Sequence, residues 1–431
     1  MFRTIKTIFS IGDLRNKIFF TLAILFVFRI GAHIPAPGVN ADVLDFEDLA
    51  AIGLLNAFGG GALENFSIFA TGIMPYITAS IIVQLLRMDV VPKFAEWSRE
   101  GDQGRKKLAQ VTRYGTVLIA FVQAIGMSFG FNNIMPGLVP DPSLLTYLMI
   151  ALTLTAGTAF LLWLGETITA KGVGNGISLM IFAGIASAIP GGVAQIYTIY
   201  IQDAGEELFV NLVIVALIAL AFLAITIGVI FVQQAIRKVP VQYAKRLGAT
   251  GQSRGAQSSH LPLKVNSAGV IPVIFAMSLF IFPPTIANFT GAEGAFAQWV
   301  VQTFDYTNSI GMMVYALLII GFTYFYTFVQ MNPEQMAENL KKQNGFIPGI
   351  RPGKTTEAFI TRTLYRLTFV GALFLATVSV LPVLFTRFAG LPQAIQIGGT
   401  GLLIVVGVAL DTMKRIESQM IDRKYTGFMR R

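Results

Sequence analysis

The sequence predicts an all-α polytopic membrane protein whose ten transmembrane helices form two inverted halves of five helices each. Three observations predict this class: the composition is apolar, the chain contains ten separate apolar runs, and basic residues fall in every second loop. Of the 431 residues, 54% are hydrophobic and 13% are charged, whereas an ordinary soluble domain carries about 25% charged residues. A bundle of membrane helices therefore takes up nearly the whole chain and leaves no room for a separate catalytic domain.

The apolar runs are spread over the whole chain, and most of them approach the roughly 20 residues that a membrane helix needs. We interpret the first run as a retained span rather than a removed signal peptide, because it lacks a clean small-x-small cleavage site. The runs cover residues 18–34, 66–86, 114–131, 145–165, 177–190, 209–235, 266–288, 310–331, 367–386 and 397–413.

The basic residues predict the orientation of these spans. Thirty of the 32 Lys and Arg residues lie in the N-terminal segment, in the C-terminal tail or in every second loop between spans. The two exceptions are Arg29, inside the first run, and Arg387, in a loop on the opposite side. Because Lys and Arg are enriched on the cytoplasmic side of membrane proteins, we expect both termini in the cytoplasm.

The chain divides into an N-terminal half, residues 1–205, and a C-terminal half, residues 206–431. Because each half contains an odd number of spans, the second half is inverted relative to the first. The segment GIMPYI at Gly72–Ile77 in the second run is echoed by GVIPVI at Gly269–Ile274 in the seventh run. Interrupted helices at matched positions of inverted repeats point to the functional centre, although glycine and proline are also common in ordinary membrane helices. We expect both helices to be broken there and to face protein or water rather than lipid alone.

The spans are nearly free of the residues that carry chemistry. Arg29 is the one charged residue well inside a run, whereas ion-coupled transporters keep acids or histidines near the bilayer midplane. The absence of cysteine excludes disulfides and thiol nucleophiles, and residues 349–355 fall one residue short of a phosphate-binding loop. No catalytic, metal or cofactor site is predicted. Four classes of membrane protein then remain to be weighed: a channel, a secondary transporter built on inverted repeats, a membrane enzyme and a structural scaffold.

Isoleucines recur at helical spacing in three of the runs. Ile73 and Ile77 lie on one face of the second span, Ile181 and Ile185 repeat this spacing in the fifth, and Ile274 is the counterpart of Ile77 in the second half. Isoleucines in membrane helices usually pack against other helices or face lipid. A hydrophobic constriction that excludes water and ions is the alternative, and the pattern leaves both open.

Two long loops lie on the basic side, residues 236–265 and 332–366. The first contains a predicted strand pair, Arg237–Tyr243 and His260–Val265, around a Gly/Ser-rich tip at 248–259. Loops of this length that are rich in Lys and Arg suit docking to an acidic partner or to RNA phosphates.

Seven short motifs, taken in order and by their position relative to the spans, resemble the SecY family, whose members form the central subunit of the bacterial protein-conducting channel. The resemblance runs essentially from end to end, and it is lost just after Arg246, so the role of the tip 248–259 stays open. The motifs are Phe58–Leu63 (FGGGAL), Gly72–Ile77 (GIMPYI), Gly172–Ile177 (GVGNGI), His260–Asn266 (HLPLKVN), Asn332–Ala337 (NPEQMA), Pro348–Gly353 (PGIRPG) and Gly398–Ile404 (GGTGLLI).

The resemblance implies a central pore that a short half-helix, the plug, closes at rest. The plug corresponds to Phe58, Gly59, Gly60, Gly61, Ala62, Leu63, Glu64 and Asn65. The positions of the family's pore ring are Ile73, Ile77, Ile181, Ile185, Ile274 and Ile404.

The resemblance also implies a lateral gate, formed by spans two and three against spans seven and eight, and a docking surface for partners. Gate residues are Pro75, Thr78, Pro272 and Phe282, and docking residues are Lys245, Arg246 and Arg351.

The function that the resemblance implies is passage of unfolded secretory polypeptides across the cell (plasma) membrane and sideways release of hydrophobic segments into lipid. The implied partners are the small membrane subunits SecE and SecG, the motor ATPase SecA, the ribosome, and signal peptides with their unfolded polypeptides. The channel itself is expected to be no enzyme, because its partners supply the energy.

Overall fold

A computed structural model describes residues 11–40, 43, 56, 59–87, 91–202, 208–243, 259–289, 294–305, 308–389 and 393–428. Each of the ten apolar runs is occupied by a helix, and in the described parts six helical segments are long and apolar enough to cross a membrane. The predicted helical polytopic class is confirmed. The ten helices are α2 (Gly12–Gly31), α4 (Met74–Leu86), α6 (Asp102–Ile134), α7 (Leu144–Lys171), α8 (Gly176–Tyr197), α9 (Leu208–Gln234), α10 (Ile271–Phe289), α12 (Ser309–Gln330), α14 (Lys354–Ala389) and α15 (Gln393–Phe428).

Shorter helices lie in the connections between these spans. They are α5 (Pro92–Arg99), the π-helical turn η2 (Thr198–Gln202), α11 (Ala295–Thr303) and α13 (Pro333–Lys342).

The two GxxP motifs mark the starts of helices rather than breaks inside them. We expected a helix through the whole second run, but residues 66–73 form turns and α4 begins only at Met74. Gly72 has a φ of 57° and Gly269 a φ of 66°, left-handed conformations that cannot continue a right-handed helix. Pro75 and Pro272 are each the second residue of their helix, where a missing N–H loses no intrahelical hydrogen bond.

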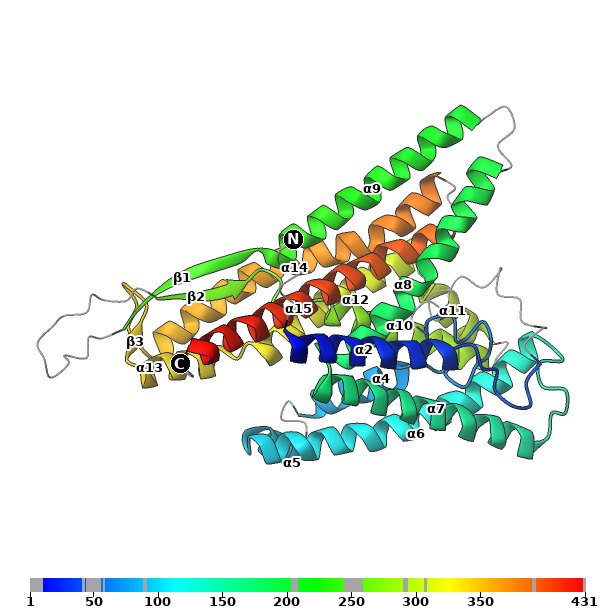
Figure 1. The fold of residues 1–431 in the computed structure, drawn as a ribbon, viewed down its shortest axis with the longest axis horizontal. Helices are drawn as coiled ribbons and strands as arrows, with labels where there is room; N and C mark the ends of the chain where they lie inside the picture. The colour runs from blue at the N-terminus through cyan, green and yellow to red at the C-terminus, as the bar shows by residue number, and fades with distance from the viewer. Residues whose placement is uncertain are drawn as a thin grey trace, which may run out of the picture.

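The helices pack as two groups that meet in two places, along α10 and where α8 packs against α15 (Figure 1). In the first group α6 packs against α4 and α7, and α7 packs against α2 and α8; in the second, α14 packs against α12 and α15. Helix α10 packs against α12 within its own group and against α4 and α6 of the other. We call the contact of α10 with α4 and α6 the seam; the α8–α15 contact joins the two groups elsewhere.

A small sheet projects from the end of the bundle where the long loops lie (Figure 1). Strands β1 (Ile236–Tyr243) and β2 (Ser259–Lys264) pair antiparallel, as predicted, with Ile236 opposite Lys264. Strand β3 (Gly345–Phe346), which pairs with the end of β1, was not predicted. The two long loops also share one hydrophobic core, so they form a single structural unit; its buried residues are Val239, Val241, Leu263, Leu340, Ile347, Ile360 and Leu364.

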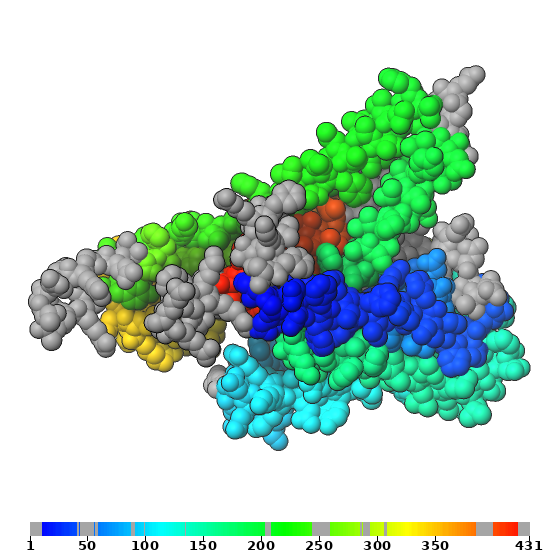
Figure 2. Space-filling model, viewed as in Figure 1, coloured from blue at the N-terminus to red at the C-terminus, as the bar shows by residue number. Residues whose placement is uncertain are grey.

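Helix α9 lies at the edge of the molecule, and α2 crosses the front of it (Figure 2). Val229 is the buried residue of α9, although α9 is the most hydrophobic of the candidate spans in the described part of the chain. Its surface is covered by lipid or by another membrane subunit once the protein is in a bilayer.

Candidate functional site

A cavity of about 810 Å³ opens between six helices from both groups. Its polar wall lies toward the loop-bearing end of the bundle, since Gln84 is in the last turn of α4 and Lys171 ends α7. At the opposite side the lining becomes apolar and contains Ile77, Ile181 and Ile274. The cavity can therefore hold water down to a layer of isoleucines.

An ion pair lies in the polar wall of this cavity. Arg113 Nε of α6 donates to Glu166 Oε1 of α7 at 2.7 Å, and both side chains line the cavity. Such a partly exposed pair adds about 0–1 kcal/mol to stability. Its clearer consequence is that the wall stays wet, because charged groups keep their water.

The start of α8 is fixed tightly against α7, and this directs two of the isoleucines inward. Asn175 caps α8, its side-chain oxygen accepting a hydrogen bond from the Ile177 amide at 3.1 Å. The amide of Gly176 donates to Thr169 Oγ1 at 2.9 Å. With its first turn held in this way, α8 places Ile181 and Ile185 in the central core, 3% exposed each.

The six isoleucines named from the sequence are all buried, at most 7% exposed, in one hydrophobic cluster that draws on both groups of helices. The space that Ile73, Ile77 and Ile181 share with Gly59 and Gly72 is only about 10 Å³, close to the minimum for a single water molecule. Ile185 contacts α15 so closely that a Cβ on Gly401 would lie 2.8 Å from its Cγ2. Ile404 follows one turn later on α15. The layer is closed.

The glycine-rich segment lies on the far side of this layer. The resemblance implied a half-helix over 58–65, but residues 60–66 form turns, because Gly60, Gly61 and Phe66 all have positive φ; Phe58 lies outside the described residues. A Cβ on Gly60 would come within 3.1 Å of the Gly184 Cα, so this backbone rests directly on α8 beside Ile185. Ala62 and Leu63 are fully buried.

The gate residues named from the sequence lie on the two helices that meet at the seam, two on α4 and two on α10. Pro75 and Pro272 are buried in the first turns of α4 and α10, whereas Thr78 is half-buried and its Oγ1 donates to the Met74 carbonyl. Phe282 is 49% exposed, near the other end of α10. Ser278 Oγ of α10 lies 3.8 Å from Met74 Sδ of α4, which joins the two helices directly.

Of the docking residues named from the sequence, the structure describes Arg351, on the sheet-bearing unit formed by the two long loops. Arg351 is exposed between two glycines of positive φ, Gly349 and Gly353, and its carbonyl accepts a hydrogen bond from Thr356 Oγ1 at 2.9 Å. Lys245 and Arg246 lie outside the described residues. They follow β1 in the chain, and the end of β1 pairs with β3, the strand that precedes the loop of Arg351.

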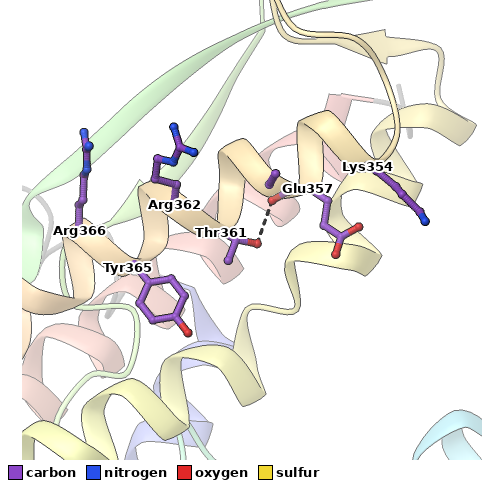
Figure 3. A pocket seen from close by; sticks show the side chains of 7 residues that line it. Lys354, Glu357, Thr361, Arg362, Tyr365 and Arg366 are labelled. Atoms are coloured by element: carbon purple, nitrogen blue, oxygen red, sulfur yellow. Dashed lines mark hydrogen bonds between the residues drawn. The ribbon is translucent and has the colours of Figure 1, made fainter.

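A shallow depression of about 870 Å³ continues this surface along α14 (Figure 3). Arg362 and Arg366 point to the same side of the helix, one turn apart, while Tyr365 points to another side. The lining also contains Lys354 and Glu357. These residues make a cationic surface and no catalytic grouping, and in the described parts of the chain no cluster of His, Asp and Glu could hold a metal ion.

The whole length of the chain matches proteins of one family. Residues 67–413 match the sequence profile of the SecY family. The chain belongs to the SecY family. A relative from Halalkalibacterium halodurans, named protein translocase subunit SecY, is 71% identical over 431 residues and covers all of both chains.

Solved structures of SecY and Sec61 share the fold at low sequence identity. A SecY structure whose plug domain is described as stabilising the closed state of the translocation channel superposes with a TM-score of 0.64 at 18% identity. It covers 93% of this chain and 91% of that one. Sec61 in the canine ribosome–channel complex gives a TM-score of 0.59 at 17% identity, with coverages of 93% and 91%.

Proposed function

We propose that this chain is the channel-forming subunit of a protein translocase and passes unfolded polypeptides across the cell membrane. The observation that carries the proposal is the polar cavity that ends at a closed isoleucine layer, with the glycine-rich segment behind it. The close relative named protein translocase subunit SecY supports the same function.

The physical requirements of such a channel fit this arrangement. An unfolded chain presents every kind of side chain, so the path cannot contain fixed polar groups that bind one of them tightly. Isoleucine side chains make weak, non-directional contacts and exclude water and ions from a narrow gap. A layer made of them can close on itself at rest and close around a polypeptide in transit.

We infer that Ile73, Ile77, Ile181, Ile185, Ile274 and Ile404 form the ring around the path and that residues 58–65 act as the plug. The close packing of Gly60 on Gly184 supports this assignment of the plug. In the SecY structure of similar fold, the plug domain is described as maintaining a membrane seal.

Hydrophobic segments leave sideways through the seam along α10. The two sides of this gate belong to the halves 1–205 and 206–431, and the packing of α10 on α4 and α6 is the contact that has to open. Pro75, Thr78, Pro272 and Phe282 are its proposed lining.

The partners dock on the sheet-bearing unit, which carries Arg351 and the loop of Lys245 and Arg246. A ribosome partner is supported by the fold shared with Sec61 in its ribosome complex. We extend the proposal to the motor ATPase SecA at the same surface and to SecE and SecG beside the exposed membrane helices. Both termini then lie in the cytoplasm, with the basic loops.

Single cysteines test the proposed path, since the chain has none of its own. Cysteines at Ile77, Ile185 and Ile274 should form disulfides with a cysteine in a stalled secretory polypeptide. A cysteine at Leu217, 61% exposed on α9, is the lipid-facing control and should form none. Cross-links at none of the three isoleucines would contradict the channel and favour a transporter built on the same fold.

A further inference from the structure

Arg29 is a charged side chain inside a membrane span, and its contact is unusual. It lies in the last turn of α2, and its Nη1 donates a hydrogen bond to the backbone carbonyl of Gly60. In the described part of the chain it forms no ion pair and has no other hydrogen bond. Charged residues within spans are costly and mark function more often than chance, and here the partner is the glycine-rich segment.

A simpler explanation is that the positive charge of Arg29 only interacts favourably with the negative, C-terminal end of the α2 dipole while the side chain extends to the membrane surface. Its surroundings argue against this. Residues on either side of it in α2, Phe26 and Ile30, are 67% and 49% exposed. Arg29 is only half-exposed, and its Nη1 would lie 3.9 Å from a Cβ on Gly61, so the guanidinium is at the glycine-rich segment.

The two ends of the glycine-rich segment are held in different ways. At the far end two backbone hydrogen bonds fix it to the chain that follows α2: the Ala36 amide donates to the Phe66 carbonyl at 2.9 Å, and the Ile68 amide donates to the Ile34 carbonyl at 3.0 Å. At the pore end, where Gly60 rests on α8, the Arg29 side chain makes the hydrogen bond to α2. This side-chain hydrogen bond can break without the loss of any backbone hydrogen bond of the segment.

We propose that Arg29 is a latch that holds the glycine-rich segment closed over the isoleucine layer and releases Gly60 when a polypeptide enters. The proposal rests on the proposed function as a channel with a plug. The left-handed φ of Gly60 and Gly61, 71° and 80°, gives the segment the turn in which the carbonyl meets the guanidinium. Because Arg29 is at the end of α2, its charge can reach water after release, so the open state does not leave a buried charge unpaired.

Ion leak through the resting channel tests the latch. The intact translocase is reconstituted into vesicles without any substrate, as wild type, Arg29→Leu, Arg29→Lys and the control Phe26→Leu on the outer side of the same helix. A hydrogen bond of a charged group to a carbonyl is among the stronger kinds, so Arg29→Leu should raise the leak about tenfold, equivalent to about 1.4 kcal/mol. Arg29→Lys should raise it less, and Phe26→Leu should leave it unchanged. Equal leaks in wild type and Arg29→Leu would overturn the latch.

A deletion of residues 60–65 separates the latch from a general weakening of the channel. The deletion removes the partner of Arg29, so Arg29→Leu should add nothing to the leak of the deletion variant. An equal increase in both backgrounds would overturn the latch. If the deletion itself does not leak, the segment is not a seal, and the proposed plug falls together with the latch; a leaky deletion beside a tight Arg29→Leu variant overturns the latch alone.

A cysteine at Ala62 reports the position of the segment without any flux. Ala62 is fully buried, and the chain has no other cysteine, so a membrane-impermeant maleimide should react slowly with Ala62→Cys in the otherwise wild-type chain. Adding Arg29→Leu should speed labelling about tenfold, the same factor as the leak. Unchanged labelling would overturn the latch even if the leak rises, because the leak would then come from elsewhere.

Discussion

At the scale of single residues, a close contact of Gly176 with Gly165 fixes the start of α8 against α7. A Cβ on Gly176 would lie 1.9 Å from the carbonyl oxygen of Gly165 on α7, whereas a Cβ on Gly191, later in the same helix, meets nothing within 4 Å. Gly176→Ala should therefore push α8 away from α7 and lower stability by about 1–3 kcal/mol. Gly191→Ala should leave stability unchanged or raise it by up to about 1 kcal/mol. Thermal unfolding in detergent measures both, and equal midpoints for the two variants would contradict this account of the α7–α8 contact.

The residues that sequence patterns found and those they missed differ in how the information is carried. Helical spacing singled out Ile73 with Ile77 and Ile181 with Ile185, and the family resemblance added the role in a ring; Ile73, Ile77 and Ile181 do meet in one layer. The contact of Arg29 with Gly60 could not be predicted, because it joins residues 31 positions apart through a backbone carbonyl, whatever side chain that residue carries. The one available signal was the charge inside a span. Phe58, Lys245 and Arg246 lie outside the described residues, so their roles stay predictions.

At the scale of elements, the seam between α10 and α4 is the structure that has to open for lateral release. Cysteines at Met74 and Ser278, whose side chains meet across it, should be joined by a short reagent that carries two thiol-reactive groups. The link should block release of hydrophobic segments into lipid while the chain stays folded, and the measurement is lipid extraction of a membrane-inserted substrate. Linking Phe129 to Tyr147, whose rings lie 4.8 Å apart within one group of helices, is the matched control. Release that continues across a completed Met74–Ser278 link would refute the gate.

Elements were predictable where one segment carries its own signal. Each span is an apolar run by itself, and β1 and β2 are near neighbours in sequence, so both were found. The start of α4 was misplaced because residues 66–73 are as apolar as a helix, whereas Phe66 and Gly72 have positive φ and the segment forms turns. Strand β3 is two residues long and pairs with a strand about a hundred residues earlier, which leaves no local pattern. The two left-handed glycines, Gly72 and Gly269, therefore mark where α4 and α10 begin, and Pro75 and Pro272 fit the first turns that follow.

At the scale of the whole molecule, the basic residues are concentrated at one end of the bundle. The spans carry almost none, and the basic residues gather on the loops at one end, which the shared core of the two long loops turns into a single surface. A partner that binds there therefore meets one surface rather than two independent loops. Clustered positive charge speeds and strengthens association with an acidic or phosphate-bearing partner, and salt weakens it.

This concentration of positive charge predicts how charge reversal at Arg351 changes the binding of a partner. Arg351 is exposed on the loop after β3 and is far from the isoleucine layer in the chain and in the fold, so Arg351→Glu should weaken partner-driven export without opening the channel or lowering its stability. Two charge units change at one point of the surface, and the loss of affinity should be about tenfold at low salt and smaller at high salt, because ions screen exposed charges. Binding of the motor or the ribosome to reconstituted vesicles at two salt concentrations measures it. Arg105 is also exposed, on α6, and Arg105→Glu is the control for the change in net charge alone. If both variants lose affinity equally, the partner responds to the overall charge of this face; if neither does, docking lies elsewhere.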